Sequence, residues 1–430
     1  MDGSGIFSGG HAGIHAWAMA TAAVVSASCA LVGTLLVVRR MSLLGDAIGH
    51  AVLPGIAVAV LAGGKPGGPL VFLGAAAAAL LTVWLTKGLR AAGGPAEDAG
   101  AGVVYTTLFA IGLIIVTAAP AGTHLDAACV LHGDLAFLPF DTVSVAGLAI
   151  PRGFIAGVIA LVVVSVATVA TWKLQVFTAF DAAAARAAGL PVAAVTTGLL
   201  AATAVATVSS FDAVGAVLVV AMLVVPAAAA ELLVHRLHVM TLVAIALAVV
   251  GACVGYVAAW HFNTSAAGMI AVVLGLEYAL AVVFTPDDGI VARAVAGLQL
   301  AWRVACEDRL ARVWRAEEAA VGGDAGRAAI PHGLLDACAG WWLRRDGSLE
   351  RVADGWRLSD RGRRAAEMVV RSHRLWEAWL GRHAELPLDH LHPPAEWVEH
   401  HLGAAMRQRL EAETGWRESD PHGREIPPEA

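Results

Sequence analysis

The sequence predicts an all-α polytopic membrane protein that continues into a mainly helical soluble domain. Of its 430 residues, 58% are hydrophobic and only 15% charged, whereas soluble domains are about 45–50% apolar and about 25% charged. The excess of apolar residues runs from Trp17 to Pro286, and ordinary soluble charge density returns from Arg293 to Ala430. Composition therefore divides the chain into a membrane part, residues 1–291, and a soluble part, residues 292–430.

Nine apolar runs approach the roughly 20 residues that a membrane-spanning helix requires. Glycine, proline or charged residues separate them, as is typical of loops. The expected spans are Ile14–Val38, Leu44–Gly63, Pro69–Leu85, Gly102–Ala118, Phe154–Thr171, Val195–Ser209, Val214–Leu233, Thr241–Trp260 and Ala266–Phe284. The region Thr123–Phe140 has room for a short re-entrant helix.

Basic residues predict the orientation, because Lys and Arg concentrate in cytoplasmic loops. An N-terminus outside the cell leaves only Lys65 and Arg152 on the outer side. The other basic clusters then face the cytoplasm, namely Arg39–Arg40, Lys87–Arg90, Lys173–Arg186, His235–Arg236 and Arg293. With nine spans, the C-terminal domain is expected in the cytoplasm.

The segment Met41–Gly55 (MSLLGDAIGHAVLPG) places ionisable residues at or inside an apolar run. Asp46 and His50 are four residues apart, so they share one face of a helix. Carboxylate and imidazole together suit Mn²⁺, Fe²⁺ or Zn²⁺, although an interfacial ion pair and an interhelical hydrogen bond would also explain them. Pro54 and Gly55 predict a kink or break, which transporters often place at a binding site.

A short helix is predicted within Phe180–Pro191 (FDAAAARAAGLP), ended by Gly-Leu-Pro. It is either an ordinary connector or a docking helix whose small residues allow a partner to approach closely. No stretch matches the phosphate-binding pattern GxxxxGK[ST], so ATP hydrolysis, if it drives this protein, occurs in a separate chain.

These motifs resemble the manganese/zinc/iron permease family of ABC transporters over about Trp17–Val291. MSLLGDAIGHAVLPG resembles the family signature, FDAAAARAAGLP its ATPase-coupling loop, and FDAVGAVLVVAMLVVPAAAAELL its next span. The resemblance implies a bacterial inner-membrane permease without enzymatic activity, with Asp46 and His50 on the metal path. It also implies that the coupling loop, with Asp181, Arg186, Gly189 and Pro191, contacts the ATPase.

By the same resemblance, the permease works with several partners. These are an ABC ATPase subunit, an extracytoplasmic metal-binding protein and a second permease subunit, identical or related, in the lipid membrane. Manganese is the favoured substrate, with zinc and ferrous iron as alternatives.

The soluble part shows helical spacing interrupted by one hairpin, Leu349–Leu358, followed by helices Arg361–Leu380 and Pro394–Thr414. In the last of these, Glu396, Glu399 and His400 are spaced i, i+3, i+4 and would share one face. Such a face suits a transition metal, but it would also serve as an ordinary solvated acidic surface.

Residues 356–427 resemble the metal-binding and dimerisation domain of diphtheria-toxin-repressor-type regulators, which implies a winged-helix-derived fold. The stretches that carry the resemblance are LSDRGRRAAEMVVRSHRLWEAWL, LPLDHLHPPAEWVEHHLG and SDPHGREIP. The resemblance places His373, Glu396, Glu399 and His400 on primary metal ligands, and Glu377 and His392 on an ancillary site.

Residues Cys306–Ala320 resemble the first helix of the same regulators, with Asp308 on a ligand position. The next expected carboxylate falls on Ala311, which leaves the primary site short of one ligand. Glu396, in place of a cysteine, resembles the manganese-responsive members, and oxygen ligands suit Mn²⁺.

DNA binding is not expected, because the candidate recognition helix, His332–Arg345, is apolar except at its end. We expect instead that the soluble domain senses cytoplasmic metal and reduces import. Two other interpretations remain open: a membrane-tethered metal-responsive transcription regulator, and an ion-coupled secondary metal transporter.

Overall fold

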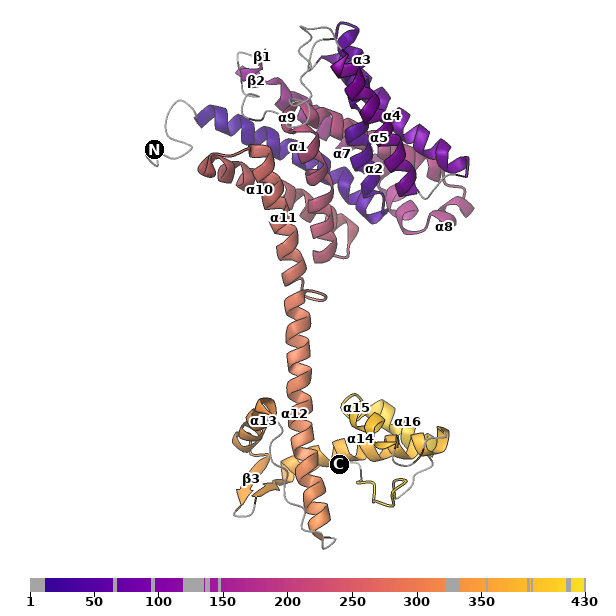
Figure 1. Cartoon of the computed structure of the whole chain (residues 1–430), viewed down its shortest axis with the longest axis vertical. Helices are drawn as coiled ribbons and strands as arrows, with labels where there is room; N and C mark the ends of the chain where they lie inside the picture. Colours follow the sequence, from indigo (N-terminus) through magenta and orange to yellow (C-terminus); the bar gives the residue numbers. More distant parts are fainter. Residues whose placement is uncertain are drawn as a thin grey trace. The chain divides into compact units, whose positions relative to one another are not determined.

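The computed structural model describes most of the chain and divides it into two compact units, Met1–Ala292 and Arg293–Ala430. The described residues are 12–64, 68–93, 97–118, 135, 140–145, 148–321, 333–352, 355–384, 387, 390–414 and 419–428. Figure 1 shows the elements of each unit.

The first unit is a bundle of apolar helices with one small hairpin. Its elements are α1 (Ala12–Val38), α2 (Ser42–Ala51), α3 (Leu53–Leu61), α4 (Pro69–Ala91), α5 (Glu97–Thr117), β1 (Thr142–Val145), β2 (Leu148–Pro151), α7 (Arg152–Phe180), α8 (Ala182–Ala187), α9 (Val192–Leu233), α10 (Leu237–Phe262) and α11 (Ala266–Phe284). The antiparallel pair β1–β2 was not predicted, and the expected re-entrant helix falls almost entirely outside the described residues.

Seven helical segments are long and apolar enough to cross a membrane, among the residues that the structure describes. Two shorter apolar segments, Ala47–Leu61 and Leu218–Leu233, lie within the second and seventh expected spans. The predicted all-helical, multi-span architecture is thus confirmed.

Helix α1 lies at the centre of this unit. It packs against α7, α9 and α10, and 78% of its most apolar window is buried, compared with 17% for α11. Its buried side chains, such as Val25, Leu35 and Leu36, join the main apolar core. The outer helices instead expose Val, Leu and Phe, as lipid-facing helices do.

The kink or break that Pro54 and Gly55 predict is present, two residues ahead of Pro54. Helix α2 ends at Ala51 and α3 begins at Leu53, with Pro54 in its first turn, where the missing N–H of proline is tolerated. Close packing holds the second piece: a Cβ on Gly55 would lie 2.1 Å from the carbonyl oxygen of Gly74 in α4. Only glycine permits this backbone contact.

Helix α9 is two limbs joined at Gly215, whose φ of 74° and ψ of 163° are non-helical. Thr196 in the first limb bonds Arg39 after α1, and Ala230 in the second lies in a cluster with Val37. Both limbs therefore reach the same end of α1, so the chain reverses at Gly215. This bears out the prediction of two successive helices here rather than one.

We predict that Gly215→Ala destabilises the protein by about 1–3 kcal/mol, because a side chain is strained in this backbone conformation. The matched control is Gly198→Ala, in the first limb of the same helix, where an added Cβ meets no atom within 4 Å. Thermal unfolding in detergent measures both variants. Equal melting temperatures for Gly215→Ala and Gly198→Ala would contradict the strained turn.

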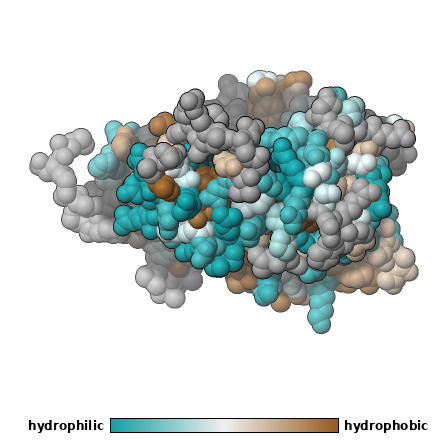
Figure 2. Space-filling model, turned by 90° about the horizontal axis from the view of Figure 1, so that it is seen from below, coloured by the Kyte–Doolittle hydropathy of each residue, from teal (hydrophilic) through white to brown (hydrophobic). Residues whose placement is uncertain are grey.

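The second unit contains α12 (Ile290–Val321), most of which lies within it, α13 (Leu334–Arg345), β3 (Leu349–Val352), β4 (Gly355–Leu358), α14 (Asp360–His383), α15 (His392–Val398) and α16 (Ala404–Thr414). The predicted hairpin is confirmed, with Leu349 paired to Leu358. Among the coloured residues on the face seen in Figure 2, hydrophilic side chains predominate.

A small apolar core joins α12, α13, the hairpin and α14 through Leu310, Leu343, Leu349, Leu358 and Ala366. The prediction of one helix over Pro394–Thr414 was wrong, because α15 stops at Val398 and α16 begins only at Ala404. This break changes which ligands can meet.

Candidate metal centres

His50 lies on the face of α2 that meets α5. Its half-buried ring has its centroid 5.9 Å from those of Tyr105 and Phe109. The neighbouring Gly49 faces α9 instead, since a Cβ there would lie 3.8–3.9 Å from Thr207, Phe211 and Val220. Asp46 lies one helical turn before His50, but its side chain is outside the described part of the structure.

The segment expected to contact an ATPase forms a short exposed helix. Asp181 caps α8, its Oδ1 accepting from the backbone N–H groups of Ala183 at 2.8 Å and Ala184 at 2.9 Å. Gly189, with φ of 78°, ends it, and Pro191 precedes α9. Arg186 folds back, its Nε donating to the carbonyl of Ala182.

Phe180, which the sequence interpretation did not single out, is 92% exposed directly before α8. A phenylalanine at the end of an apolar span carries no distinguishing sequence signal, so only the structure reveals it as an exposed aromatic group.

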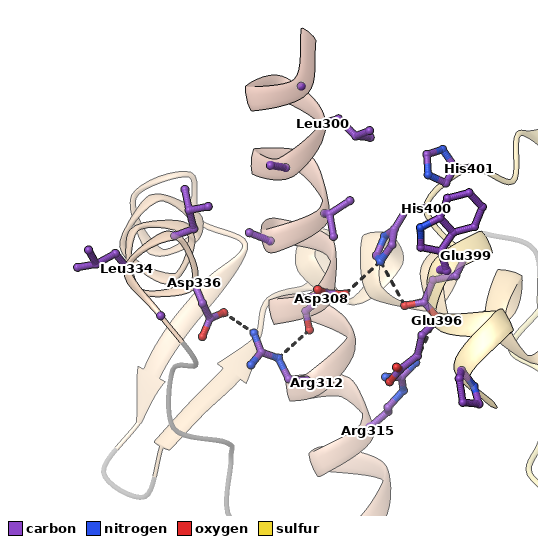
Figure 3. A pocket seen from close by; sticks show the side chains of 18 residues that line it. Leu300, Asp308, Arg312, Arg315, Leu334, Asp336, Glu396, Glu399, His400 and His401 are labelled. Carbon is purple, nitrogen blue, oxygen red and sulfur yellow. Dashed lines mark hydrogen bonds and ion pairs between the residues drawn. The ribbon is translucent and has the colours of Figure 1, made fainter. Parts of the chain in front are cut away.

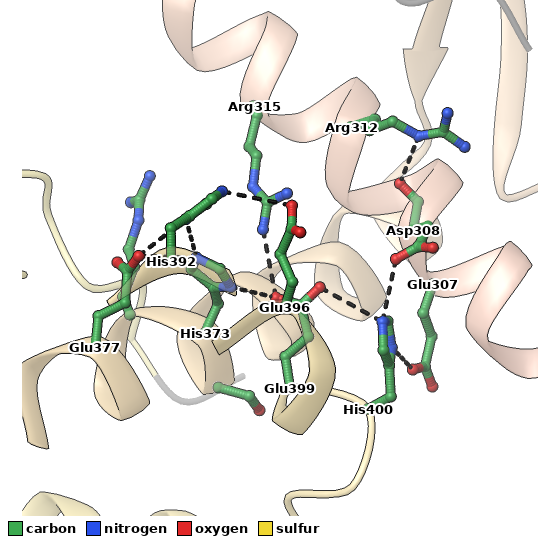
Figure 4. Close-up of polar contacts among 12 residues, drawn as sticks. Glu307, Asp308, Arg312, Arg315, His373, Glu377, His392, Glu396, Glu399 and His400 are labelled. Carbon is green, nitrogen blue, oxygen red and sulfur yellow. Dashed lines mark hydrogen bonds and ion pairs between the residues drawn. The ribbon is translucent and has the colours of Figure 1, made fainter. Parts of the chain in front are cut away.

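In the second unit, one group of potential ligands joins α14 to the start of α15. His373 Nε2 lies 3.1 Å from Glu377 Oε1 and 2.9 Å from His392 Nδ1, and that nitrogen of His392 lies 3.0 Å from the same Glu377 oxygen. His373 and Glu377 are buried, whereas the side chain of His392 is 49% exposed. We call these three residues the inner triad (Figure 4).

A second group, the outer triad, brings Asp308 from α12 to Glu399 and His400 after α15. His400 Nε2 lies 3.1 Å from Asp308 Oδ1 and 3.6 Å from Glu399 Oε1. Glu399 also links the two groups, since its Oε2 lies 2.6 Å from His373 Nδ1. The two triads are therefore neighbours that share one polar network (Figure 4).

Two predicted ligands occupy other places than the resemblance implies. His373, expected with the primary ligands, belongs geometrically to the inner triad. Glu396 belongs to neither: its side chain is 59% exposed, and its Oε1 lies 3.5 Å from His392 Nε2. The Glu396 carboxylate lies beside His392, whereas Glu399 and His400 are directed towards His373 and Asp308.

Ala311, at the position of the missing carboxylate, is fully buried and packs with Val369, Val370 and Trp314. It contributes to the apolar core and offers no ligand.

Glu307 was missed from the sequence. Its Oε2 accepts a hydrogen bond from His400 Nδ1 at 2.7 Å, which leaves Nε2 of His400 directed at Asp308 and Glu399. Such an outer partner orients a metal-binding imidazole and fixes its tautomer. Its only sequence signal was its position next to Asp308.

Opposite charges stabilise both triads. Burial disfavours a charged His400, but its hydrogen bonds to Asp308 and Glu307 and the nearby charge of Glu399 raise its pKa to about 10. Burial also opposes the ionised form of Glu377, yet hydrogen bonds from His373 and His392 lower its pKa to about 2. A divalent cation would replace protons as the counter-charge of these carboxylates.

The outer triad lines a groove of about 1130 Å³ within the second unit (Figure 3). Arg312 and Arg315 line the same groove. Arg312 pairs with Asp336 of α13, and Nη2 of Arg315 lies 3.4 Å from Glu399 Oε2. The outer triad is therefore accessible from the groove, whose lining carries both acidic and basic side chains.

The residues present fit a transition-metal ion. In each triad, one atom from each side chain lies within 4.8 Å of the others. Imidazole nitrogens and carboxylate oxygens without thiolate suit Mn²⁺, Fe²⁺ and Zn²⁺. The inner triad offers two nitrogens and one oxygen, the outer triad one nitrogen and two oxygens.

Comparison with known proteins decides the class of the membrane unit. The family described as "ABC 3 transport family" matches residues 13–285. The chain belongs to this family. It is therefore a membrane permease subunit of a transport system and not an enzyme.

Individual relatives agree. The chain is 42% identical to the manganese transport system membrane protein MntD of Bacillus subtilis over 289 residues, covering 66% of this chain and 97% of the relative. It is 34% identical to the zinc transport system membrane protein TroD of Treponema pallidum, covering 64% of this chain and 75% of the relative. The solved structure of PsaBC from Streptococcus pneumoniae in complex with Fab is similar, with a TM-score of 0.55 and 25% sequence identity. The match covers 64% of this chain and 92% of the chain in that structure.

The second unit of this permease has its own match. The family "Iron dependent repressor, metal binding and dimerisation domain" matches residues 359–428. That range contains the inner triad, Glu399 and His400, whereas Asp308 and Glu307 lie on α12, ahead of it. The outer triad thus combines the matched domain with a helix outside the match.

We predict that His400→Ala lowers by one the number of Mn²⁺ ions that the purified full chain binds, because it removes the nitrogen ligand of the outer triad. Glu307→Ala keeps that ligand but weakens the same site by about 10–100-fold, because it removes the acceptor that orients the His400 ring. Equilibrium dialysis in detergent measures both. The matched control, His401→Ala, removes an exposed neighbouring imidazole, and a loss of binding as large as that of His400→Ala would rule out the assignment.

Proposed function

We propose that this permease carries a divalent transition metal across the bacterial inner membrane as part of an ABC importer, with Mn²⁺ favoured over Zn²⁺ and Fe²⁺. The family membership supports the transport role. The names of the relatives support the substrate class, since they include manganese and zinc systems and the chelated iron transport system membrane protein YfeC of Yersinia pestis, 29% identical over 63% of this chain and 86% of the relative.

The metal path is proposed to pass α2, with Asp46 and His50 as the groups that contact the ion. An imidazole at the break between two helix pieces supports this, because interrupted helices are where transporters bind ions. Tyr105 and Phe109 on α5 limit the space around the His50 ring. An ionisable residue inside an apolar helix is costly unless it faces a polar path or a ligand.

The proposed ATPase contact is α8 with its flanking residues, including Asp181, Arg186, Gly189 and Pro191. A capped, exposed helix of small residues can enter a partner's groove, and the exposed ring of Phe180 adds apolar contact area. The importer would further require an extracytoplasmic metal-binding protein and a second permease subunit. An N-terminus outside the cell, indicated by the basic loops, places α8 and the second unit on the cytoplasmic side.

The second unit is proposed to sense cytoplasmic metal and to reduce import when it is loaded. One observation carries this proposal: His400 and Glu399 meet Asp308 on α12, the helix that follows the last span after a short turn. Metal held between these elements would clamp α15 to α12 within the sensing unit. His373, Glu377 and His392 would hold a second ion, with Glu396 as an additional ligand.

The surface of α13 favours this role over DNA binding. A recognition helix presents polar and basic side chains to the bases, whereas Leu334 is 88% and Trp341 60% exposed on α13. Its acidic residue, Asp336, is buried and paired with Arg309 and Arg312 of α12.

We predict that His50→Ala abolishes uptake of radioactive Mn²⁺ by cells expressing the complete importer. Removal of a direct ligand should cost more than the about 10–100-fold that an outer partner costs. The control is His261→Ala, an exposed imidazole at the end of α10. Normal uptake by His50→Ala, with membrane insertion verified, would exclude this metal path.

We also predict that the sensing unit limits import. In cells loaded with Mn²⁺, uptake by the wild type should fall, whereas His400→Ala and a chain stopped after Asp288 should continue to import. His401→Ala should behave as the wild type. Uptake that falls equally in wild type, His400→Ala and the truncated chain would show that the second unit does not act as a feedback gate.

A further inference from the structure

Arg39, directly after α1, forms a polar junction among three helices. Its Nη2 donates to the side-chain oxygen of Gln175 at 2.6 Å, to the backbone carbonyl of Gln175 at 3.2 Å and to the hydroxyl of Thr178 at 2.6 Å. Its Nη1 donates to the hydroxyl of Thr196 at 3.2 Å. A guanidinium, with five donors in a fixed plane, can hold several partners at once.

These partners lie on either side of α8. Gln175 and Thr178 belong to the last turns of α7, which ends at Phe180, and Thr196 lies in the first turns of α9. The side chains of Gln175 and Thr178 are almost fully buried, each about 4% exposed. Hydrogen bonds from a charged group are strong when the partners are buried. Arg39 therefore links the two helix ends that flank α8, those of α7 and α9, to the end of α1.

The same residue adjoins α2. After Arg39 the chain turns sharply at Arg40, whose φ is 57°, and the backbone N–H of Met41 donates to Leu36 O at 2.8 Å. Helix α2 starts at the next residue. The first turn of α2 packs tightly against α1 and α9, since a Cβ on Gly45 would lie 2.9 Å from the side chain of Leu223 and 3.2 Å from that of Leu36.

The ends of α7 and α9 that Arg39 joins are not packed closely against each other everywhere. An open groove of about 280 Å³ lies between α7 and α9 and is lined by Gln175, Pro191 and Val195 among others. Along this groove fewer side-chain contacts oppose a displacement of the two helix ends.

We propose that Arg39 is a positioning residue that transmits movement of α8 to α2, the helix that carries Asp46 and His50. This inference rests on the proposed function, in which α8 meets an ATPase and α2 lines the metal path. An ATPase that displaces α8 moves the ends of α7 and α9, and the guanidinium carries that displacement across to the turn at Arg40 and the start of α2.

The test compares Mn²⁺ transport with ATP hydrolysis in liposomes that contain the complete importer. Arg39→Ala should retain ATP hydrolysis but lower the Mn²⁺ transported per ATP by about tenfold, within the usual range of coupling between sites. Arg39→Lys, a single ammonium that cannot hold all the partners, should lie between Arg39→Ala and the wild type. The matched control, Arg40→Asn, removes the exposed neighbouring charge and tolerates the positive φ, so its ratio should be unchanged.

A purely structural role would lower transport and hydrolysis together through loss of folded protein. Thr178→Val and Thr196→Val each remove one hydrogen-bond partner of Arg39 and keep the proposal testable if Arg39→Ala fails to fold. Both should lower the amount of Mn²⁺ transported per ATP hydrolysed. An unchanged ratio in these two variants, or in Arg39→Ala, would overturn the proposal. Absence of Mn²⁺ transport by the wild type would instead refute the proposed function itself.

Discussion

The need to satisfy every polar group within an apolar bilayer governs the membrane unit. Unpaired backbone groups are too costly there, so the chain is helical, and buried hydroxyls such as those of Thr203, Thr207 and Ser210 bond to backbone carbonyls in their own helix. The interruption after Ala51 and the reversal at Gly215 occur in well-packed regions. Irregular backbone is tolerated only where protein or a polar path surrounds it, and there it can serve transport.

The same principle makes Arg39 informative. Burying a guanidinium next to an apolar helix is costly unless it has partners, and Arg39 uses its two terminal nitrogens, Nη1 and Nη2, to join α1 to α7 and α9. Its partners bracket the segment proposed to contact the ATPase, and its own chain leads into the helix proposed to contact the metal. The hydrogen bonds of Arg39 thus connect the neighbourhood of α8, the proposed ATPase contact, to the start of α2, the proposed metal path.

In the second unit, by contrast, charged side chains are concentrated and paired with one another. Its two triads hold imidazoles against carboxylates, and Glu307, Arg315 and Arg312 surround them with further charges. In each triad the ligand atoms lie within 4.8 Å of one another, and the outer triad lines a groove. Ligands gathered beside an open groove suit the reversible metal binding that the proposed sensor requires.

The sequence by itself determined the features that depend on local pattern: the apolar helices, the break near Pro54, the short helix before Gly189 and the hairpin after α13. It also carried the resemblances that the family matches bear out. Only the tertiary structure decided which distant groups meet, because helical periodicity defines a face but not its partner. It brought Asp308 to His400, placed Glu396 beside His392 but outside both triads, and joined Arg39 to Thr178 and Thr196.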